Sequence, residues 1–399
     1  MTLGFVRSRC RILVLGCVLA CVICLGASTV EAVDERILLD ATINGKPAHM
    51  ALDTGATHLI LFRQGAERLG LKVTRPPQDV QLGPGQVPLG RTEACDFVLG
   101  TGRTRTPFAV FEPPSFLKLG IDGVVGWQPV RYNTIRIDAE QRTTTWLTNT
   151  PPETTTWFKL RIRSESRVLT LELPGSDDPM GLLTVDTGSS SGVALRPERW
   201  QEWKAAHTNQ PVTLMAGYMP GAGTVATEES WAKELALGGL VLTEVPVMPA
   251  NTVQQAIGAA GFQASLGLAA LKRMELIVDG NLGIAYLRPK TGPPPAYEHN
   301  RLGAVFVPPN MEGGDLGARV VEGSPAYEAG VRNGDVLLKI GDLDVTKWRT
   351  DPAVLPLTRF WERPPGSRLE LTLKRGTQTL KITAVLRQIL GPAPASPVR

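Results

Sequence analysis

The chain has 399 residues, of which 43% are hydrophobic and 20% are charged, a composition typical of folded globular proteins rather than of disordered chains. This length favours two or three domains. The formal net charge of +4 at pH 7 is small, and it excludes the strongly basic field that nucleic-acid binding requires. With 41 Gly, 32 Pro and only 6% aromatic residues, the composition favours a β-rich protein with many turns.

Residues 1–32 have the layout of a secretory signal peptide. Three arginines precede an almost unbroken apolar run, and a small residue, Ala32, ends the segment. We therefore expect cleavage after Ala32 and a secreted or periplasmic mature chain. Retention of the segment as a membrane anchor, or a lipid anchor on Cys17 or Cys21, stays open as an alternative. Only Cys95 lies outside this segment, so we expect no internal disulfide.

A short motif occurs twice in the middle of the chain. Asp53-Thr54-Gly55 follows the apolar residues 50–52, and Asp186-Thr187-Gly188 follows the apolar strand pattern at 182–185. Asp and Gly are common in turns, so a single copy would indicate no more than a tight turn after a strand. Two copies in matching contexts indicate an internal duplication.

Each motif is followed at a similar distance by an apolar element that ends in glycine. These elements are Val124-Val125-Gly126 and, with a weaker first position, Ser265-Leu266-Gly267. The segments between these landmarks alternate short strand-like runs with turns rich in Gly, Pro and Asn, and show little helical periodicity. The duplication therefore predicts two similar β-rich lobes, at 33–150 and 155–290.

The two motifs resemble the active-site signatures of aspartic proteases of the retropepsin and pepsin kind. The resemblance implies a mainly β fold with two retropepsin-like (acid-protease) β-barrel lobes in tandem. It also implies that Asp53 and Asp186 are catalytic and hold one water between them. Two carboxyl groups that lie so close share one proton and titrate as a pair. The ionised one would take a proton from water and the protonated one would donate to the peptide carbonyl.

The other residues of the motifs have supporting roles in this interpretation. Gly55 and Gly188 allow two backbones to approach where a Cβ would clash. The hydroxyls of Thr54 and Thr187 bond across to the opposite lobe. Because Ser189 can donate to Asp186 while Ala56 cannot do so to Asp53, we expect Asp186 to be the ionised partner.

A loop that covers the substrate should lie between each aspartate and its apolar-Gly element. The candidates are Leu82–Gln86 in the first lobe and Gly217–Gly221 in the second, and the sequence does not choose between them.

The last third of the chain, at 300–390, resembles a PDZ domain of the bacterial type. The resemblance rests on the Gly-Ser-Pro-Ala, Ala-Gly-Val and Gly-Asp-Val elements between 323 and 336, after a stiff Pro-rich linker. It implies an α+β domain that binds an extended peptide as an added strand, with the terminal carboxylate in a loop formed by Leu302, Gly303 and Ala304. A PDZ domain that packs on the protease lobes and binds nothing stays open. We expect the tail at 391–399 to be disordered.

The sequence therefore predicts an aspartic endopeptidase that acts on polypeptides and whose PDZ domain has a C-terminal peptide as a possible ligand. It predicts no cofactor, and no metal site, because the four histidines have no metal-ligand spacing. One alternative is a non-catalytic peptide-binding scaffold, and another is a homodimer in which each lobe pairs with its twin. Ser190, at the centre of a Gly-x-Ser-x-Gly pattern, is a weak candidate for a serine nucleophile.

Overall fold

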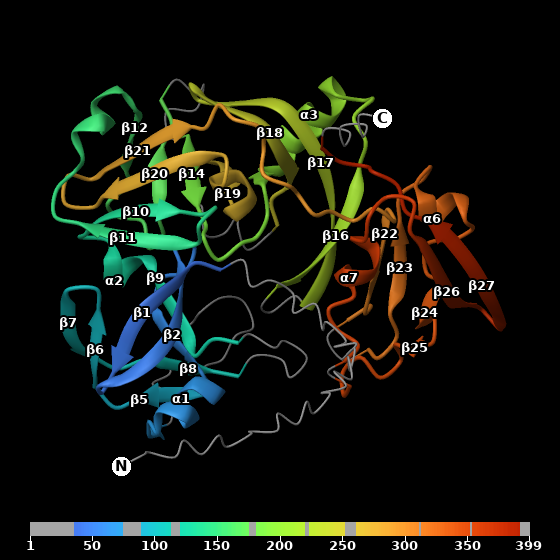
Figure 1. The fold of residues 1–399 in the computed structure, drawn as a ribbon, viewed down its shortest axis with the longest axis horizontal. Coiled ribbons are helices and arrows are strands. Elements are labelled where there is room, and N and C mark those ends of the chain that lie inside the picture. Colours follow the sequence, from blue (N-terminus) through green and yellow to red (C-terminus); the bar gives the residue numbers. More distant parts are fainter. Residues whose placement is uncertain are drawn as a thin grey trace, which may run out of the picture. The chain divides into compact units, whose positions relative to one another are not determined.

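The computed structural model describes residues 36–74, 89–112, 120–174, 181–219, 223–251, 261–310, 313–351 and 353–391 (Figure 1). The predicted signal segment, the flap candidate at 82–86 and all of the predicted tail except Gly391 lie outside these residues. Within the described part of the chain, no helix is long and apolar enough to cross a membrane.

The first lobe is built around a nine-stranded sheet with the order β4-β5-β8-β3-β9-β2-β1-β6-β7. Two short helices, α1 (Arg63–Leu69) and α2 (Trp127–Val130), accompany it. The strands are β1 (Leu38–Ile43), β2 (Lys46–Asp53), β3 (Leu59–Phe62), β4 (Val73–Thr74), β5 (Gly90–Thr92), β6 (Cys95–Leu99), β7 (Gly102–Thr106), β8 (Ala109–Phe111) and β9 (Gly123–Gly126).

A tight turn aligns β2 for the site that it carries. Asn44 and Gly45 both have positive φ, 50° and 77°, which is the conformation of a type I′ hairpin turn and the one that an Asn-Gly pair favours. The turn pairs Ile43 with Lys46 and continues the register to Leu38 and Ala51. The buried apolar residues that follow, up to Leu52, anchor the end of β2 in the core.

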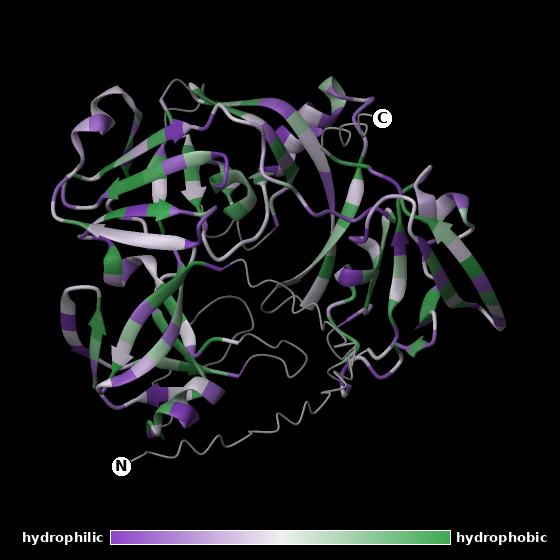
Figure 2. Ribbon diagram, in the orientation of Figure 1, coloured by the Kyte–Doolittle hydropathy of each residue, from purple (hydrophilic) through white to green (hydrophobic). Residues whose placement is uncertain are grey.

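The second lobe belongs to a twelve-stranded sheet with the order β11-β10-β20-β21-β12-β13-β14-β19-β15-β18-β17-β16. Figure 2 shows β20 as largely hydrophobic and the Thr-rich β11 as mostly white, which marks intermediate hydropathy. The elements are β10 (Thr134–Asp138), β11 (Thr143–Leu147), the 3-10 helix η1 (Pro152–Thr156), β12 (Phe158–Ile162), β13 (Thr170–Glu172), β14 (Leu182–Val185), β15 (Val193–Leu195), α3 (Pro197–Ala206), β16 (Thr213–Met219), β17 (Gly223–Leu237), β18 (Leu240–Pro249), β19 (Phe262–Leu266), α5 (Leu268–Leu271), β20 (Met274–Asp279) and β21 (Ile284–Pro289).

This sheet joins the two lobes. β10, which follows the first apolar-Gly element, pairs antiparallel with β20, which follows the second, and Thr134 lies opposite Asp279. Asp138 and Asp279 cap equivalent turns, since each Oδ1 accepts two backbone N–H groups at the end of its strand. A continuous cluster of buried apolar side chains runs through both lobes. The lobes therefore share strands and core.

The long strand β17 changes its partner along its length. Its first half, up to Glu229, pairs only with β16, whereas the half that begins at Ser230 pairs with β18. The hairpin formed by 213–219 and 223–229, called here the β16–β17 hairpin, therefore extends beyond the rest of the sheet (Figure 1).

The C-terminal domain has its own sheet, of order β22-β23-β24-β26-β27, and its own apolar core. Its strands are β22 (Ala304–Val307), β23 (Gly317–Val320), β24 (Val336–Ile340), β25 (Leu343–Asp344), β26 (Arg368–Arg375) and β27 (Gln378–Val385), and its helices are α6 (Pro325–Glu328) and α7 (Thr358–Trp361). Ala304 and Phe306 point into this core, whereas Val305 and Val307 pack against Leu214 of β16.

The predicted fold class is confirmed: the molecule is mainly β, with aspartic-protease-like lobes and a PDZ-like α+β domain. One detail differs from the expectation. Among the described residues, the sheets of the lobes run as open paths of hydrogen-bonded strands rather than as closed barrels. The physical reason is that β10 pairs with β20 on one side and with β11 on the other, so these two strands belong to the second sheet and do not close the first.

Candidate active site

The two Asp-Thr-Gly motifs begin at the ends of equivalent strands. Asp53 ends β2, which runs parallel to β9, and lies opposite Gly126 in the register. Asp186 directly follows β14, which runs parallel to β19, and its backbone N–H donates to Leu266 O at 2.9 Å. Both aspartates are partly exposed, so solvent can reach them.

The glycines of the motifs show that the two aspartates face each other. A Cβ on Gly55 would lie 2.5 Å from Oδ1 of Asp186, and a Cβ on Gly188 would lie 2.3 Å from Cγ of Asp53. Each carboxyl group therefore sits over the glycine of the other motif, where any side chain would displace it. Each also accepts the N–H of the glycine in its own motif, at 3.0 Å for Asp53 and 3.1 Å for Asp186. A single chain thus brings both motifs together.

The two carboxyl groups are coupled in their titration, and the pKa of each lies above its ordinary value. Burial and the charge of Asp53 raise the pKa of Asp186 to about 8. Burial also raises the pKa of Asp53, but the N–H groups of Gly55 and Ala56 and the hydrogen bond from Asp186 oppose this rise. The pair therefore shares one proton over a broad pH range.

The bond from the Ser189 hydroxyl to Asp186, on which the expected ionisation of Asp186 rests, is not among the hydrogen bonds of the described residues. The hydroxyl of Ser189 pairs with that of Ser191 at 2.7 Å, and it also accepts the Ser191 N–H at 3.3 Å. It is the backbone N–H of Ser189 that bonds to Asp186 and lowers the pKa of that carboxyl group. Backbone N–H groups lower the pKa of both carboxyl groups, since Asp53 accepts those of Gly55 and Ala56 and Asp186 accepts those of Gly188 and Ser189.

The threonines of the motifs lock the two loops together, as expected. Thr54 Oγ1 donates to Val185 O at 2.7 Å and accepts the N–H of Thr187 at 3.1 Å. Thr187 Oγ1 donates to Leu52 O at 2.8 Å and accepts the N–H of Thr54 at 3.0 Å. Both side chains are fully buried. The four crossed bonds fix the position of each aspartate relative to the other.

The two apolar-Gly elements form backbone hydrogen bonds with the aspartate loops. Gly126 N donates to His58 O at 3.0 Å, and Gly267 N donates to Gly192 O at 2.9 Å. The residue after each glycine repeats the symmetry, because Trp127 N donates to Ala56 O and Leu268 N donates to Ser189 O, both at 2.8 Å. The site therefore has approximate twofold symmetry down to its backbone.

The remaining predicted residues belong to β16 and to the C-terminal domain. Of the two flap candidates, only residues 217–219 lie in the described part of the chain, in β16. In the PDZ domain, Leu302, Gly303 and Ala304 are buried, and the N–H groups of the first two donate to Oδ1 of Asn300 at 2.9 and 3.1 Å. The position of an Asn two residues before Leu-Gly is the sequence signal that could have indicated this capping.

Sequence reasoning also missed a buried carboxyl group at the base of the β16–β17 hairpin. Glu229 is 2% exposed and accepts a hydrogen bond from the hydroxyl of Tyr297 in the linker. Burial, with a smaller contribution from the charge of Glu362, raises the pKa of Glu229 from 4.5 to about 7. At a pH between these two pKa values, Glu229 holds a proton in the native state but has lost it in the unfolded chain. The free energy of unfolding therefore falls as the pH rises through this range.

The Glu229→Gln variant is therefore expected to become more stable than the parent protein as the pH rises from 5 to 8. The gain should reach about 3 kcal/mol, since each unit of pKa shift corresponds to about 1.4 kcal/mol. Urea unfolding at both pH values measures it. The control is Glu228→Gln, because Glu228 is half-exposed and pairs with Lys204. Equal pH slopes for parent and Glu229→Gln would contradict the prediction.

Comparison with known proteins gives two family matches. Residues 39–128 match the model of the aspartyl protease family, and residues 318–375 match a PDZ domain model. No curated protein sequence matches the chain. Among solved structures, an aspartic proteinase from Irpex lacteus is 12% identical, with a TM-score of 0.40 over 64% of this chain and 94% of that one. The retroviral protease-like domain of Ddi1 from Leishmania major is 22% identical, with a TM-score of 0.22, and the match covers 29% of this chain and 90% of that domain.

Among the described residues, no group of three or more His, Cys, Asp or Glu side chains is arranged to hold a metal ion.

The two family matches confirm the resemblance that the sequence motifs predicted. The chain combines a region that matches aspartyl proteases with a C-terminal region that matches PDZ domains.

Proposed function

We propose that this protein is an aspartic endopeptidase that hydrolyses peptide bonds of a polypeptide substrate at Asp53 and Asp186. The observation that carries the proposal is the mutual approach of the two carboxyl groups over the glycines of the opposite motifs. The aspartyl protease match of the first lobe supports the same reaction class. The PDZ domain serves peptide recognition in this proposal, and the signal-like segment at 1–32 supports action outside the cytoplasm.

We assign the shared proton to Asp186, whose pKa is raised to about 8, and the ionised role to Asp53. Asp53, as the ionised partner, takes a proton from a water molecule while that water attacks the peptide carbonyl carbon. Asp186, which holds the shared proton, donates it to the carbonyl oxygen as negative charge develops there. As the tetrahedral intermediate collapses, Asp53 passes its proton to the leaving amine, and the hydroxyl that becomes the new carbonyl returns its proton to Asp186, so the dyad again holds one proton. No covalent intermediate with the enzyme forms.

The proposal is tested with the mature chain and a reduced, carboxymethylated protein as unfolded substrate, between pH 4 and pH 10. We expect new N-termini to appear, and the rate to fall above about pH 8 as Asp186 loses its proton. At the acidic end the rate should fall when Asp53 becomes protonated. N-terminal labelling with mass spectrometry detects the cleavage. Absence of cleavage would favour the non-catalytic scaffold, and a rate that keeps rising to pH 10 would contradict the shared-proton mechanism.

A further inference from the structure

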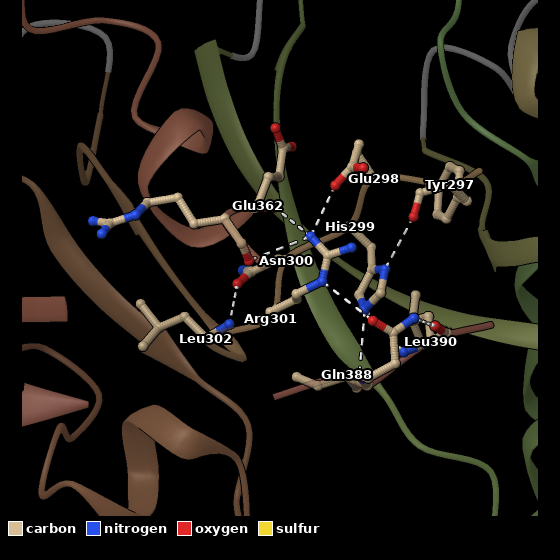
Figure 3. Close-up of polar contacts among 11 residues, drawn as sticks. Tyr297, Glu298, His299, Asn300, Arg301, Leu302, Glu362, Gln388 and Leu390 are labelled. Atoms are coloured by element: carbon tan, nitrogen blue, oxygen red, sulfur yellow. Dashed lines mark hydrogen bonds and ion pairs between the residues drawn. The ribbon is translucent and has the colours of Figure 1, made fainter. Parts of the chain in front are cut away.

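The side chain of Asn300 fills the loop that a peptide carboxylate would enter in a PDZ domain. Its Oδ1 accepts the N–H groups of Leu302 and Gly303, and Figure 3 shows the first of these bonds. Backbone N–H groups in such a loop are the groups that recognise a terminal carboxylate. Asn300 thus supplies from within the chain the oxygen that a ligand would otherwise supply.

The amide nitrogen of the same side chain connects Asn300 to β16 of the second lobe. Nδ2 of Asn300 donates to Leu214 O in β16 at 2.8 Å and to Ala304 O in β22 at 2.8 Å. The backbone carbonyl of Asn300 accepts a bond from Thr213 Oγ1 at 2.7 Å. Beside these polar contacts, Leu214 packs against Val305 and Val307. One side chain therefore connects the PDZ loop with the β16–β17 hairpin.

The hydrogen bonds of the Asn300 side chain use all of its donors and acceptors, so it has none left for a peptide ligand. An amide side chain has two donor hydrogens and an acceptor oxygen with two lone pairs, and all four are used here. Asn300 is 4% exposed, so water cannot replace a partner that is lost. A peptide carboxylate can reach the N–H groups of Leu302 and Gly303 only if the Asn300 side chain leaves them. That movement also takes the Nδ2 donor away from Leu214 O.

We propose that Asn300 is a latch between peptide recognition and the β16–β17 hairpin. In this proposal, a C-terminal carboxylate displaces Oδ1 of Asn300, and the hairpin then loses a hydrogen bond that ties it to the PDZ domain. Without ligand, the latch keeps the loop closed and the hairpin fixed. The inference rests on the peptide-recognition part of the proposed function and is independent of cleavage.

Hydrogen exchange of the full chain tests the latch, in an Asp53→Asn background so that peptides stay intact. The probe is a pool of pentapeptides that have a free C-terminus and differ in their C-terminal residue, which is apolar in every case. The control is the same pool with amidated C-termini. We expect the carboxylate pool to speed the exchange of 213–217 and 223–229 at least about fivefold, the effect of losing about one hydrogen bond. The amidated pool should have no effect. Binding of carboxylate peptides without faster hairpin exchange would overturn the proposal.

The Asn300→Ala variant tests the same coupling from the other direction. It should show fast hairpin exchange without any peptide, and it should bind the carboxylate pool at least about tenfold more tightly, because no side chain competes for the loop. The matched control is Asn333→Ala, which removes another side chain that accepts a backbone N–H of the PDZ domain, that of Val320. Unchanged hairpin exchange in Asn300→Ala, or failure of this variant to bind any carboxylate peptide, would contradict the latch. Both readouts are independent of proteolysis, so failure of the latch and failure of the protease proposal are distinguishable.

Discussion

Replacement of either Asp53 or Asp186 by asparagine is expected to lower kcat/KM for an unfolded protein substrate at least about 10³-fold. Asparagine has nearly the same shape as aspartate, but it can neither accept nor release the shared proton. The double variant should be no slower than the slower single variant, because groups that act as a unit do not contribute additively. Rates of appearance of new N-termini at pH 5 to 7 measure all three variants.

The matched control for these variants is Asp138→Asn. Asp138 caps a turn with Oδ1, which accepts the N–H groups of Glu140 and Gln141. An asparagine keeps that acceptor, so this variant should cleave at the parent rate. If Asp53→Asn or Asp186→Asn alone kept about half of the activity, two separate sites would exist. That result would favour the homodimer of twin lobes over a dyad within one chain.

The aspartate loops could be predicted from the sequence because their determinants are local and occur twice. A motif that follows an apolar strand places its aspartate at the strand end, and the second copy indicates the partner. The approach of Gly55 and Gly188 to the opposite carboxyl groups follows from the same symmetry. The resemblance adds the chemistry, and the two family matches agree with it.

The features that the sequence did not reveal depend on orientations and long-range pairings. Whether the Ser189 hydroxyl points to Asp186 or to Ser191 is one such orientation, and no periodicity encodes that choice. The bond from Nδ2 of Asn300 reaches Leu214 O, which lies 86 residues away in another domain. The shared sheet depends on the pairing of β10 with β20, which a division into two closed lobes does not anticipate.

The crossed threonine bonds predict a second large effect, on stability as well as on activity. In Thr54→Val, the N–H of Thr187 and the carbonyl of Val185 lose their fully buried partner. Each orphaned group costs about 1–3 kcal/mol, so we expect a loss of about 4 kcal/mol in the free energy of unfolding. Thr187→Val should cost a similar amount through the N–H of Thr54 and the carbonyl of Leu52. Urea unfolding measures both.

The double variant and a serine control separate the hydrogen bonds from packing. Thr54→Ser keeps the hydroxyl and loses one methyl group, so it should cost no more than about 1 kcal/mol. Because the two hydroxyls also contact each other at 3.4 Å, the double valine variant should lose less than the sum of the single variants. Since these bonds fix Asp53 relative to Asp186, both valine variants should also lower kcat with KM nearly unchanged. If Thr54→Val and Thr54→Ser were equally stable and equally active, the crossed bonds would not be what holds the dyad together.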